Sequence, residues 1–210
     1  MTTVHLTRHG ETTWHAENRY AGSSDVPLTA RGREQGDALA RWAATAAIDV
    51  VATSDLSRAV ETGDAAAKML GVNVVIDARL REVHFGAGEG RTRAEMAELF
   101  PEQLAAFVDS PASSPLPGAE SGTAAVARGL DALADLIRVA GPDGGVLVVA
   151  HSTLIRLVLC RVLGLPLDDY RRRFPGLANT AVTTVELPPA AEAAGLVGAG
   201  ALIRFNAGVA

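Results

Sequence analysis

Two histidine residues stand directly after short apolar segments, and their neighbours are residue types that handle phosphate groups. His9 lies in Arg8-His9-Gly10-Glu11, and His151 lies in Ala150-His151-Ser152. A neutral imidazole can attack phosphorus in line, while guanidinium groups and a second imidazole hold the equatorial oxygens as charge spreads over them. These residue types therefore favour phosphoryl transfer through a covalent intermediate on histidine.

Two further side chains complete a candidate set for this chemistry. Arg58 follows the apolar segment 49–53, and Glu82 follows the apolar segment 72–76. A carboxyl group such as that of Glu82 can protonate a leaving alkoxide. Because uncatalysed hydrolysis of a phosphate monoester is extremely slow, a catalyst needs several preorganised charges and not one histidine alone.

The chain alternates between short apolar segments and longer segments with helical spacing. The apolar segments predict six strands, at 4–7, 49–53, 72–76, 146–150, 181–187 and 201–205. Helical spacing predicts helices at 30–46, 57–70, 121–139 and 152–163, with two short helices between 92 and 109. The stretches 109–118 and 188–200 are rich in Pro, Ala and Gly and are expected to be irregular.

The arrangement of these elements predicts where the candidate residues meet. The segment 146–150 is apolar throughout, which is typical of a central strand covered by helices on both faces. We therefore predict an α/β fold, a three-layer α/β/α sandwich with a mostly parallel central sheet of about six strands. Ligands of such sheets bind beyond the carboxyl ends of the strands, where the candidate residues stand. With 210 residues, the chain is expected to form one domain, 1–210.

Composition excludes several other classes of protein. The net charge of -5 argues against a nucleic-acid-binding protein, and no stretch of about 20 apolar residues could cross a membrane. The single cysteine, Cys160, lies in an apolar run and is expected to be a buried, inert thiol. The glycine-rich segment 86–90 lacks the flanking strand and helix of a dinucleotide-binding loop. We therefore expect a soluble, cytoplasmic protein without a nucleotide cofactor or a metal site.

Several motifs occur in an order that is characteristic of one family. The chain resembles the histidine phosphatase superfamily, also called the phosphoglycerate mutase-like family, over about residues 4–187. The matching blocks are Leu6-Thr7-Arg8-His9-Gly10-Glu11-Thr12, Asn18-Arg19-Tyr20-Ala21-Gly22, Pro27-Leu28-Thr29-Ala30-Arg31-Gly32, Thr53-Ser54-Asp55-Leu56-Ser57-Arg58-Ala59, Leu80-Arg81-Glu82, Phe85-Gly86 through Glu89-Gly90, Pro117-Gly118-Ala119-Glu120-Ser121 and Val149-Ala150-His151-Ser152.

The resemblance implies a role for each matching residue. His9 would be the nucleophile, Glu82 the general acid and then the base that activates water, and the phosphate pocket would comprise Arg8, Arg58 and His151. A nearby backbone carbonyl, such as that of Gly10, could fix the tautomer of His9. Three residues would contribute backbone or hydroxyl donors to the substrate, namely Gly22, Ser23 and Ser152.

One position departs from the family pattern. Many members have Asn after the tryptophan, whereas this chain has His15 after Trp14. An imidazole can still donate a hydrogen bond to a phosphate oxygen, but its charge would depend on pH. His15 is therefore a candidate substrate-binding residue whose contribution is expected to vary with pH.

The segment after the proposed acid separates the branches of the family. Cofactor-dependent phosphoglycerate mutases of this family carry a long basic insertion there, whereas residues 82–120 are short and hold only Arg91 and Arg93 as basic residues. The resemblance is therefore to the phosphatase branch, and it implies a metal-independent phosphomonoesterase that acts on small phosphorylated metabolites such as sugar phosphates or phosphoglycerate-type esters. A cofactor-dependent mutase and a non-catalytic phosphate-binding domain are the alternatives. Dimerisation is common in the family, so a homodimer is possible.

Other readings of single residues lead to further expectations. His5 lies inside the first expected strand and is expected to pack in the core. Glu82 could instead form a plain surface ion pair with Arg79 or Arg81. The walls of the site are expected to come from 18–24, 84–92, 99–118 and 171–174.

Overall fold

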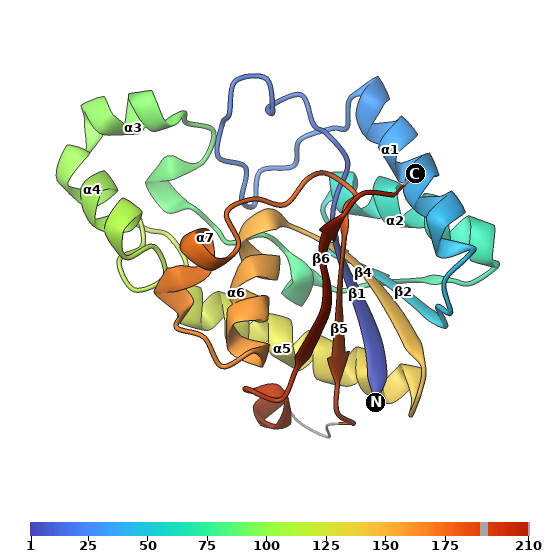
Figure 1. Cartoon of the computed structure of the whole chain (residues 1–210). Coiled ribbons are helices and arrows are strands. Elements are labelled where there is room, and N and C mark those ends of the chain that lie inside the picture. The colour runs from blue at the N-terminus through green and yellow to red at the C-terminus, as the bar shows by residue number, and fades with distance from the viewer. Residues whose placement is uncertain (190–192, 210) are drawn as a thin grey trace.

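The computed structural model describes residues 1–189 and 193–209, which are organised around one six-stranded sheet (Figure 1). The strands lie in the order β3-β2-β4-β1-β5-β6. Their bounds are Thr2–Arg8 (β1), Val50–Thr53 (β2), Val74–Ile76 (β3), Gly145–Ala150 (β4), Val182–Leu187 (β5) and Ala201–Ala207 (β6). The expected α/β fold with a six-stranded sheet is confirmed.

Strand direction decides which residues meet at one edge of the sheet. Strands β1, β4, β2 and β3 pair in parallel, whereas β5 is antiparallel to both β1 and β6. The sheet is therefore mostly parallel, as expected, with β5 running against the rest. Because Val182 at the start of β5 pairs with Thr7 near the end of β1, the segment before β5 reaches the edge where β1 ends.

Two helix pairs cover the two faces of the sheet. Helices α1 (Ala30–Ala43) and α2 (Ser57–Leu70) pack with Leu147 and Val149 of β4 in one buried cluster. Helices α5 (Gly122–Ala140) and α6 (Ser152–Val162) pack with Val146 and Val148 of the same strand in another. Successive side chains of a strand point to opposite faces, so these clusters lie on opposite sides of β4. The expected three-layer sandwich is confirmed.

Capping residues define where the main helices begin and end. The hydroxyl groups of Thr29 and Ser121 accept backbone N–H bonds at the starts of α1 and α5, and Gly71 closes α2 in the left-handed conformation. Helix α1 ends at Ala43, three residues before the expected end, because the hydroxyl group of Thr45 binds the carbonyl of Trp42 and the chain turns there.

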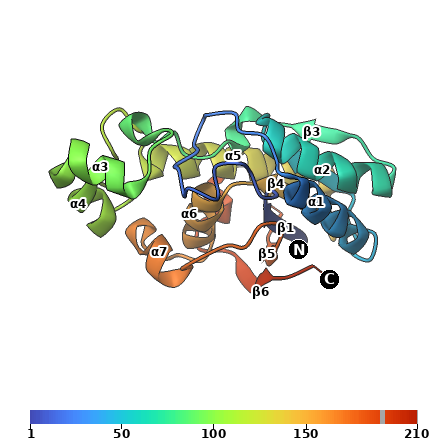
Figure 2. The same ribbon diagram turned by 90° about the horizontal axis from the view of Figure 1, so that it is seen from above.

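Two short helices extend beyond the sheet next to α6 and α7, as Figures 1 and 2 show. They are α3 (Arg93–Leu99), which begins with a capping box made by Thr92 and Glu95, and α4 (Pro101–Asp109). The sequence predicts both. It does not predict the single turn α7 (Tyr170–Arg173) or the short 3-10 helices, which are Ala78–Leu80, Gly86–Gly88, Leu167–Asp169 and Ala193–Leu196.

The structure also tests the expectations for isolated residues. His5 is buried, with its Nδ1 atom 3.0 Å from the hydroxyl oxygen of Thr184, and its ring meets that of Trp42 edge-on. Cys160 is fully buried, and burial raises the pKa of its thiol to about 11. Both expectations are confirmed. None of the helices that the model describes is long and apolar enough to cross a membrane.

Candidate active site

His9 directly follows β1 and is held in one tautomer by the backbone. Its Nδ1 atom lies 2.7 Å from the carbonyl oxygen of Gly10, so Nδ1 carries the proton and donates, and Nε2 keeps its lone pair. The side chain is 5% exposed. Burial, followed by the charges of Arg8 and Arg58, holds the pKa of His9 well below its ordinary value. His9 is therefore a neutral imidazole with a free lone pair, which is the form that a nucleophile needs.

His151 stands beside His9 at the end of β4. The two ring centroids are 5.1 Å apart. The Nε2 atom of His151 lies 2.7 Å from the hydroxyl oxygen of Ser54, whose proton has no other acceptor among the described residues and is therefore donated to Nε2. The proton of the neutral His151 ring then lies on Nδ1, which is buried and has no hydrogen-bond partner among the described residues. Burial, together with the charge of Arg58, holds the pKa of His151 well below its ordinary value.

Two arginines add positive charge around these rings. Arg8 donates through Nη1 to the carbonyl of Leu177, 3.1 Å away. Arg58, in the first turn of α2, is fully buried and donates to the carbonyls of Ser24 and Gly22 at 2.7 and 2.8 Å. The Nε atoms of both arginines are buried and lack a hydrogen-bond partner among the described residues. The site thus holds buried N–H donors that the protein itself does not satisfy, which is rare in folded proteins.

Glu82 is a buried carboxylate at the start of α6. Its Oε2 atom accepts the N–H of Thr153 and its Oε1 atom accepts that of Leu154, both at 2.9 Å. The reading of Glu82 as a surface ion pair is wrong, because Arg79 pairs with Asp77 and Asp135, and Arg81 pairs with Asp55. Glu82 instead lines the same cavity as His9.

Arg128 fixes the segment that carries Glu82. Its guanidinium group donates to the carbonyl oxygens of Arg79, Arg81 and Glu82, and it pairs with Glu120 at 2.8 Å. One side chain of α5 therefore binds three backbone carbonyls around the proposed acid, which positions the Glu82 backbone relative to α6.

His15 lies at the phosphate end of the site, but with a charge state that differs from the expectation. Its Nε2 atom lies 2.7 Å from Nη2 of Arg8 and 3.2 Å from the amide nitrogen of Asn179. Both of these nitrogens can only donate, so Nε2 accepts, and the ring proton lies on Nδ1, 2.8 Å from the hydroxyl oxygen of Thr12. Burial, followed by the charge of Arg8, lowers the pKa of His15 to about 4. Near neutral pH His15 is therefore uncharged, and its contribution is not expected to vary with pH there.

The backbone donors of Gly22 and Ser23 are used inside the protein. Both N–H groups, with the N–H and hydroxyl groups of Ser24, donate to the carboxylate of Glu89, which also accepts the N–H of Phe85. The expectation that these two amides face the substrate is corrected, because Glu89 takes them. Neither residue belongs to the cavity lining that the structure describes. A substrate contact by Ser23 stays a prediction that rests on its hydroxyl group, whereas the amide of Gly22 is taken by Glu89.

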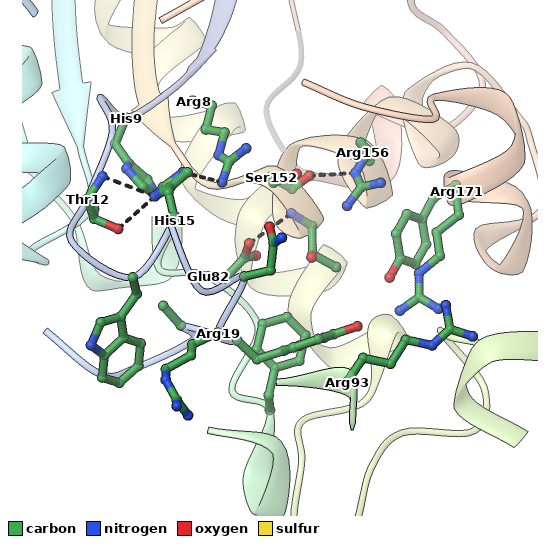
Figure 3. Close-up of a pocket in the computed structure, with 17 residues that line it drawn as sticks. Arg8, His9, Thr12, His15, Arg19, Glu82, Arg93, Ser152, Arg156 and Arg171 are labelled. Carbon is green, nitrogen blue, oxygen red and sulfur yellow. Dashed lines mark hydrogen bonds between the residues drawn. The ribbon is translucent and has the colours of Figure 1, made fainter. Parts of the chain in front are cut away.

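A cavity of about 430 Å³ opens beside His9 and Glu82 (Figure 3). Ser152 lines this cavity, as its proposed contact with substrate requires. The stretch 99–118 contributes nothing to the lining among the described residues, contrary to expectation, whereas α3, α6 and α7 contribute arginines and a tyrosine. The lining comprises Arg8, His9, Thr12, Trp14, His15, Asn18, Arg19, Tyr20, Ala21, Glu82, Phe85, Arg93, Ser152, Thr153, Arg156, Tyr170 and Arg171.

Four supporting residues have no role in the sequence analysis, namely Ser54, Glu89, Arg128 and Asn179. Asn179 donates to the backbone carbonyl of His9 at 2.7 Å from a position just before β5. A search restricted to residues that follow strands misses it, since β5 runs antiparallel and its beginning lies at the site. Ser54 and Glu89 lie within the family motifs of this sequence, and those motifs could have indicated that both residues support the site. No signal in the sequence indicates Arg128.

Proteins of known name resemble this chain over most of its length. It is 33% identical over 187 residues to a probable phosphoglycerate mutase GpmB of Enterobacter sp. (strain 638), covering 89% of this chain and 85% of that protein. It is 35% identical, with the same coverage, to the protein of that name from Serratia proteamaculans (strain 568).

Solved structures show the same fold. A mycobacterial glucosyl-3-phosphoglycerate phosphatase superposes with a TM-score of 0.86 at 28% identity, covering 98% of each chain. Bacillus stearothermophilus YhfR superposes with a TM-score of 0.87 at 28% identity, covering 99% of this chain and 98% of that one. The family model of the histidine phosphatase superfamily (branch 1) matches residues 4–196. The ordered motifs, the fold and this match agree, and the chain belongs to branch 1 of the histidine phosphatase superfamily.

Proposed function

We propose that the protein is a phosphomonoesterase that hydrolyses small phosphorylated metabolites through a phosphohistidine intermediate on His9. The observation that carries the proposal is a set of buried N–H donors around His9 that have no hydrogen-bond partner in the described part of the chain, namely Nε of Arg8, Nε of Arg58 and Nδ1 of His151. Leaving buried donors unsatisfied costs free energy, about 1–3 kcal/mol for each group. A phosphoryl group next to His9 would accept hydrogen bonds from such donors and remove this cost.

His15 supports the same placement through Arg8. Its Nε2 atom accepts a hydrogen bond from Nη2 of Arg8 at 2.7 Å and lies 3.2 Å from the amide nitrogen of Asn179. The contact orients a guanidinium group that has further N–H donors for a phosphate oxygen. We therefore assign His15 to the phosphate end of the site as an uncharged residue that positions Arg8.

The first chemical step transfers the phosphoryl group to the protein. The lone pair on Nε2 of His9 forms a bond to phosphorus while the bond from phosphorus to the ester oxygen breaks. Glu82 enters this step protonated and gives its proton to the leaving oxygen, so the alcohol departs and Glu82 is left ionised. Arg8, Arg58 and His151 hold the phosphoryl oxygens as charge shifts among them, and His15 orients Arg8.

The second step releases phosphate. A water molecule attacks the phosphorus of phosphohistidine, Glu82 accepts a proton from that water, and the electron pair of the phosphorus–nitrogen bond returns to Nε2 of His9. Inorganic phosphate forms, and both His9 and Glu82 recover their starting protonation states. In this scheme the arginines supply the positive charge, and we propose that the reaction needs no metal ion.

A mutase is the second candidate function, favoured by the names of the relatives from Enterobacter and Serratia. A mutase must retain a phosphorylated acid and return the phosphoryl group to it. We favour hydrolysis because residues 82–120 are short and lack the basic insertion of the cofactor-dependent mutases. The two candidates differ in product, since a mutase yields an isomeric phosphate ester from a bisphosphate-primed enzyme and a phosphatase yields inorganic phosphate.

The test is phosphate release from p-nitrophenyl phosphate, sugar phosphates and phosphoglycerates in EDTA, by wild type and by His9→Ala. We expect turnover by the wild type in EDTA and its loss in His9→Ala. The absence of phosphate release from every compound would overturn the phosphatase proposal. Interconversion of phosphoglycerates primed with 2,3-bisphosphoglycerate would then establish the mutase, and phosphate binding alone would indicate a non-catalytic domain.

A further inference from the structure

We propose that the cavity contains a second anion-binding subsite, formed by Arg93, Arg156 and Arg171, that recognises a carboxylate or a second phosphate group on the substrate. This inference deepens the proposed function and rests on it. Under the inference, the substrate class narrows from phosphate esters in general to small metabolites that carry an additional negative charge.

The three arginines line the same cavity as His9 but lie on its other side. Figure 3 shows Arg8, His9 and His15 at one side, Glu82 and Ser152 between, and the three arginines at the other. They come from three separate elements, α3, α6 and α7, so no local sequence periodicity explains why they meet. Arginines on one solvated helix face would lie close together in the sequence, whereas these three lie far apart in it. A shared ligand therefore explains better why they line one cavity.

Arg156 is the most restrained of the three. Its Nε atom donates to the carbonyl of Ser152 at 3.0 Å, and its guanidinium carbon lies 4.8 Å from the centre of the Tyr170 ring. It forms no ion pair with a carboxylate, and its Nη2 atom has no hydrogen-bond partner, among the residues that the structure describes. A half-buried guanidinium held by a ring and a carbonyl has its orientation fixed before a ligand arrives.

Arg171 is held in a similar way from α7. Its guanidinium carbon lies 4.4 Å from the centre of the Phe107 ring, and Nη1 donates to the carbonyl of Phe107 at 3.2 Å. Arg93 is exposed at the start of α3. Neither forms an ion pair with a carboxylate in the described part of the chain. The adjacent Arg172 and Arg173, which point elsewhere, both pair with Asp169.

The charge balance of the cavity also points to an anionic ligand. Five arginines line it, against one carboxylate, that of Glu82, among the described residues. Of these arginines, Arg19 is neutralised by Glu17 and Glu95. The chain as a whole carries a net charge of -5, so the positive charge is concentrated here against the overall balance. Such a concentration of positive charge attracts anions, and it costs free energy when no anion is bound.

The ligand chemistry follows from the guanidinium group. Arginine presents a planar fork of N–H donors that matches the oxygens of a carboxylate or a phosphate, and three arginines from different directions can hold either. Both groups are therefore candidates. Pairs of substrates that differ only in the presence of a carboxylate, or only in the presence of a second phosphate, distinguish the two candidates.

The experiment compares kcat/KM within three matched pairs of substrates for wild type. The pairs are 3-phosphoglycerate with glycerol 3-phosphate, 6-phosphogluconate with glucose 6-phosphate, and fructose 1,6-bisphosphate with fructose 6-phosphate. We expect the member with the extra anion to be preferred by about tenfold or more in at least one pair, as one charge-assisted contact provides. Preference in the first two pairs identifies a carboxylate, and preference in the third identifies a phosphate group.

The variants Arg171→Gln and Arg93→Gln then test which residues carry the preference. We expect each to reduce the preference ratio several-fold by raising KM for the anionic member, and Arg156→Gln to do the same. Arg172→Gln, a neighbouring arginine outside the cavity, is the control and should leave the ratio unchanged. Because Arg93 is exposed, Arg93→Gln keeps the test valid if Arg156→Gln or Arg171→Gln does not fold.

Three results would overturn the subsite. They are a wild-type ratio within about twofold of one in every pair, an unchanged ratio in both Arg93→Gln and Arg171→Gln, and an equal loss in Arg172→Gln. Hydrolysis of p-nitrophenyl phosphate tests the proposed function independently of the subsite. If wild type hydrolyses this compound and His9→Ala does not, the proposed function holds whatever the result for the subsite. If wild type hydrolyses p-nitrophenyl phosphate without any such preference, only the subsite is wrong.

Discussion

The Nδ1 atom of His9 lies 2.7 Å from the carbonyl oxygen of Gly10. This one hydrogen bond places the ring proton on Nδ1 and leaves Nε2 as the only ring atom that can attack phosphorus. The sequence motif places Gly10 after His9, so the arrangement requires no contact from a distant part of the chain. Burial and two neighbouring arginines keep the ring neutral, so the nucleophile is ready at neutral pH without a separate base.

The variant Glu82→Gln tests the general acid. Glutamine cannot supply a proton, so kcat for alkyl phosphates should fall by about 10² to 10⁴. The loss should be much smaller for phosphorylation of the enzyme by p-nitrophenyl phosphate, because p-nitrophenolate leaves without a proton. Burst kinetics on the two classes of ester measure this difference. Equal losses in the burst rate for both classes would show that Glu82 does not protonate the leaving group.

His15 is expected to act as an uncharged hydrogen-bond partner of Arg8 and not through a charge. The variant His15→Ala should raise KM for p-nitrophenyl phosphate by about tenfold, since it removes a hydrogen bond from a charged group. His15→Asn, which supplies a side-chain acceptor and is the residue common in the family, should keep KM close to that of wild type. Steady-state kinetics between pH 5 and pH 8 provide the measurement. If Asn is as damaging as Ala at every pH, the role of His15 as a hydrogen-bond partner is wrong.

The free energy of unfolding should decrease as the solution is acidified below about pH 6.5. Four histidines, His5, His9, His15 and His151, have pKa values lowered in the folded protein, in each case mainly by burial. The unfolded chain therefore binds more protons in this range, which favours unfolding. Their contribution to stability is complete above the unfolded pKa and is lost as the pH falls toward the folded pKa values.

Urea unfolding at a series of pH values measures this dependence. Because the pKa of His15 is lowered to about 4, the variant His15→Asn should show a shallower loss of stability between pH 6.5 and pH 4. Identical pH dependence in the variant and wild type would contradict the low pKa of His15. His5→Gln offers a comparison outside the site, since His5 packs against Trp42 and Thr184 and its pKa is also lowered.

Glu89 is expected to be a positioning residue for Arg58. Its carboxylate binds the amides of Gly22, Ser23 and Ser24, and the carbonyls of the same loop accept hydrogen bonds from Arg58. In Glu89→Gln, the side-chain NH2 group replaces one carboxylate oxygen. An N–H donor then faces the backbone N–H groups of the loop, which are donors too. The loop should loosen, KM for p-nitrophenyl phosphate should rise by about tenfold, and stability should fall by about 1–3 kcal/mol.

Inhibition by vanadate separates this role from a general loss of stability. If Glu89 positions Arg58, the affinity for vanadate should fall in Glu89→Gln at a temperature where the variant is fully folded. Glu17→Gln is the matched control, since Glu17 is exposed and pairs with Arg19 alone among the residues that the structure describes. Unchanged vanadate affinity in Glu89→Gln would leave Glu89 as a purely structural residue.

The local pattern of apolar and polar residues in the sequence was sufficient to predict the layers of the fold and the main groups of the site. Strands and helices alternate, and β4 is apolar on both faces, so the sandwich and the central position of β4 follow from the sequence. Arg8, His9 and His151 stand where strands end, so the rule for open sheets predicts that they meet. The structure places Arg8, His9 and Glu82 along one cavity and the ring of His151 5.1 Å from that of His9, whereas Arg58 and His151 do not belong to the described lining.

The remaining features depend on contacts between distant parts of the chain. From the sequence, the amides of Gly22 and Ser23 could bind either a ligand or a side chain. They bind the side chain of Glu89, because the fold places it next to them. Asn179 reaches the site because β5 runs antiparallel, which a pattern of apolar residues does not reveal. Arg156 and Arg171 share the cavity because α6 and α7 pack together, and their spacing in the sequence gives no sign of this.

The most direct test of the central claim is to trap the phosphorylated protein. Wild type is mixed with p-nitrophenyl phosphate, quenched in denaturant at alkaline pH within the first turnover, digested and examined by mass spectrometry. We expect one phosphorylated residue, His9, with an adduct that is stable to alkali and labile to acid, and no adduct in His9→Ala. Phosphorylation of another residue, or turnover that continues in His9→Ala, would contradict the account.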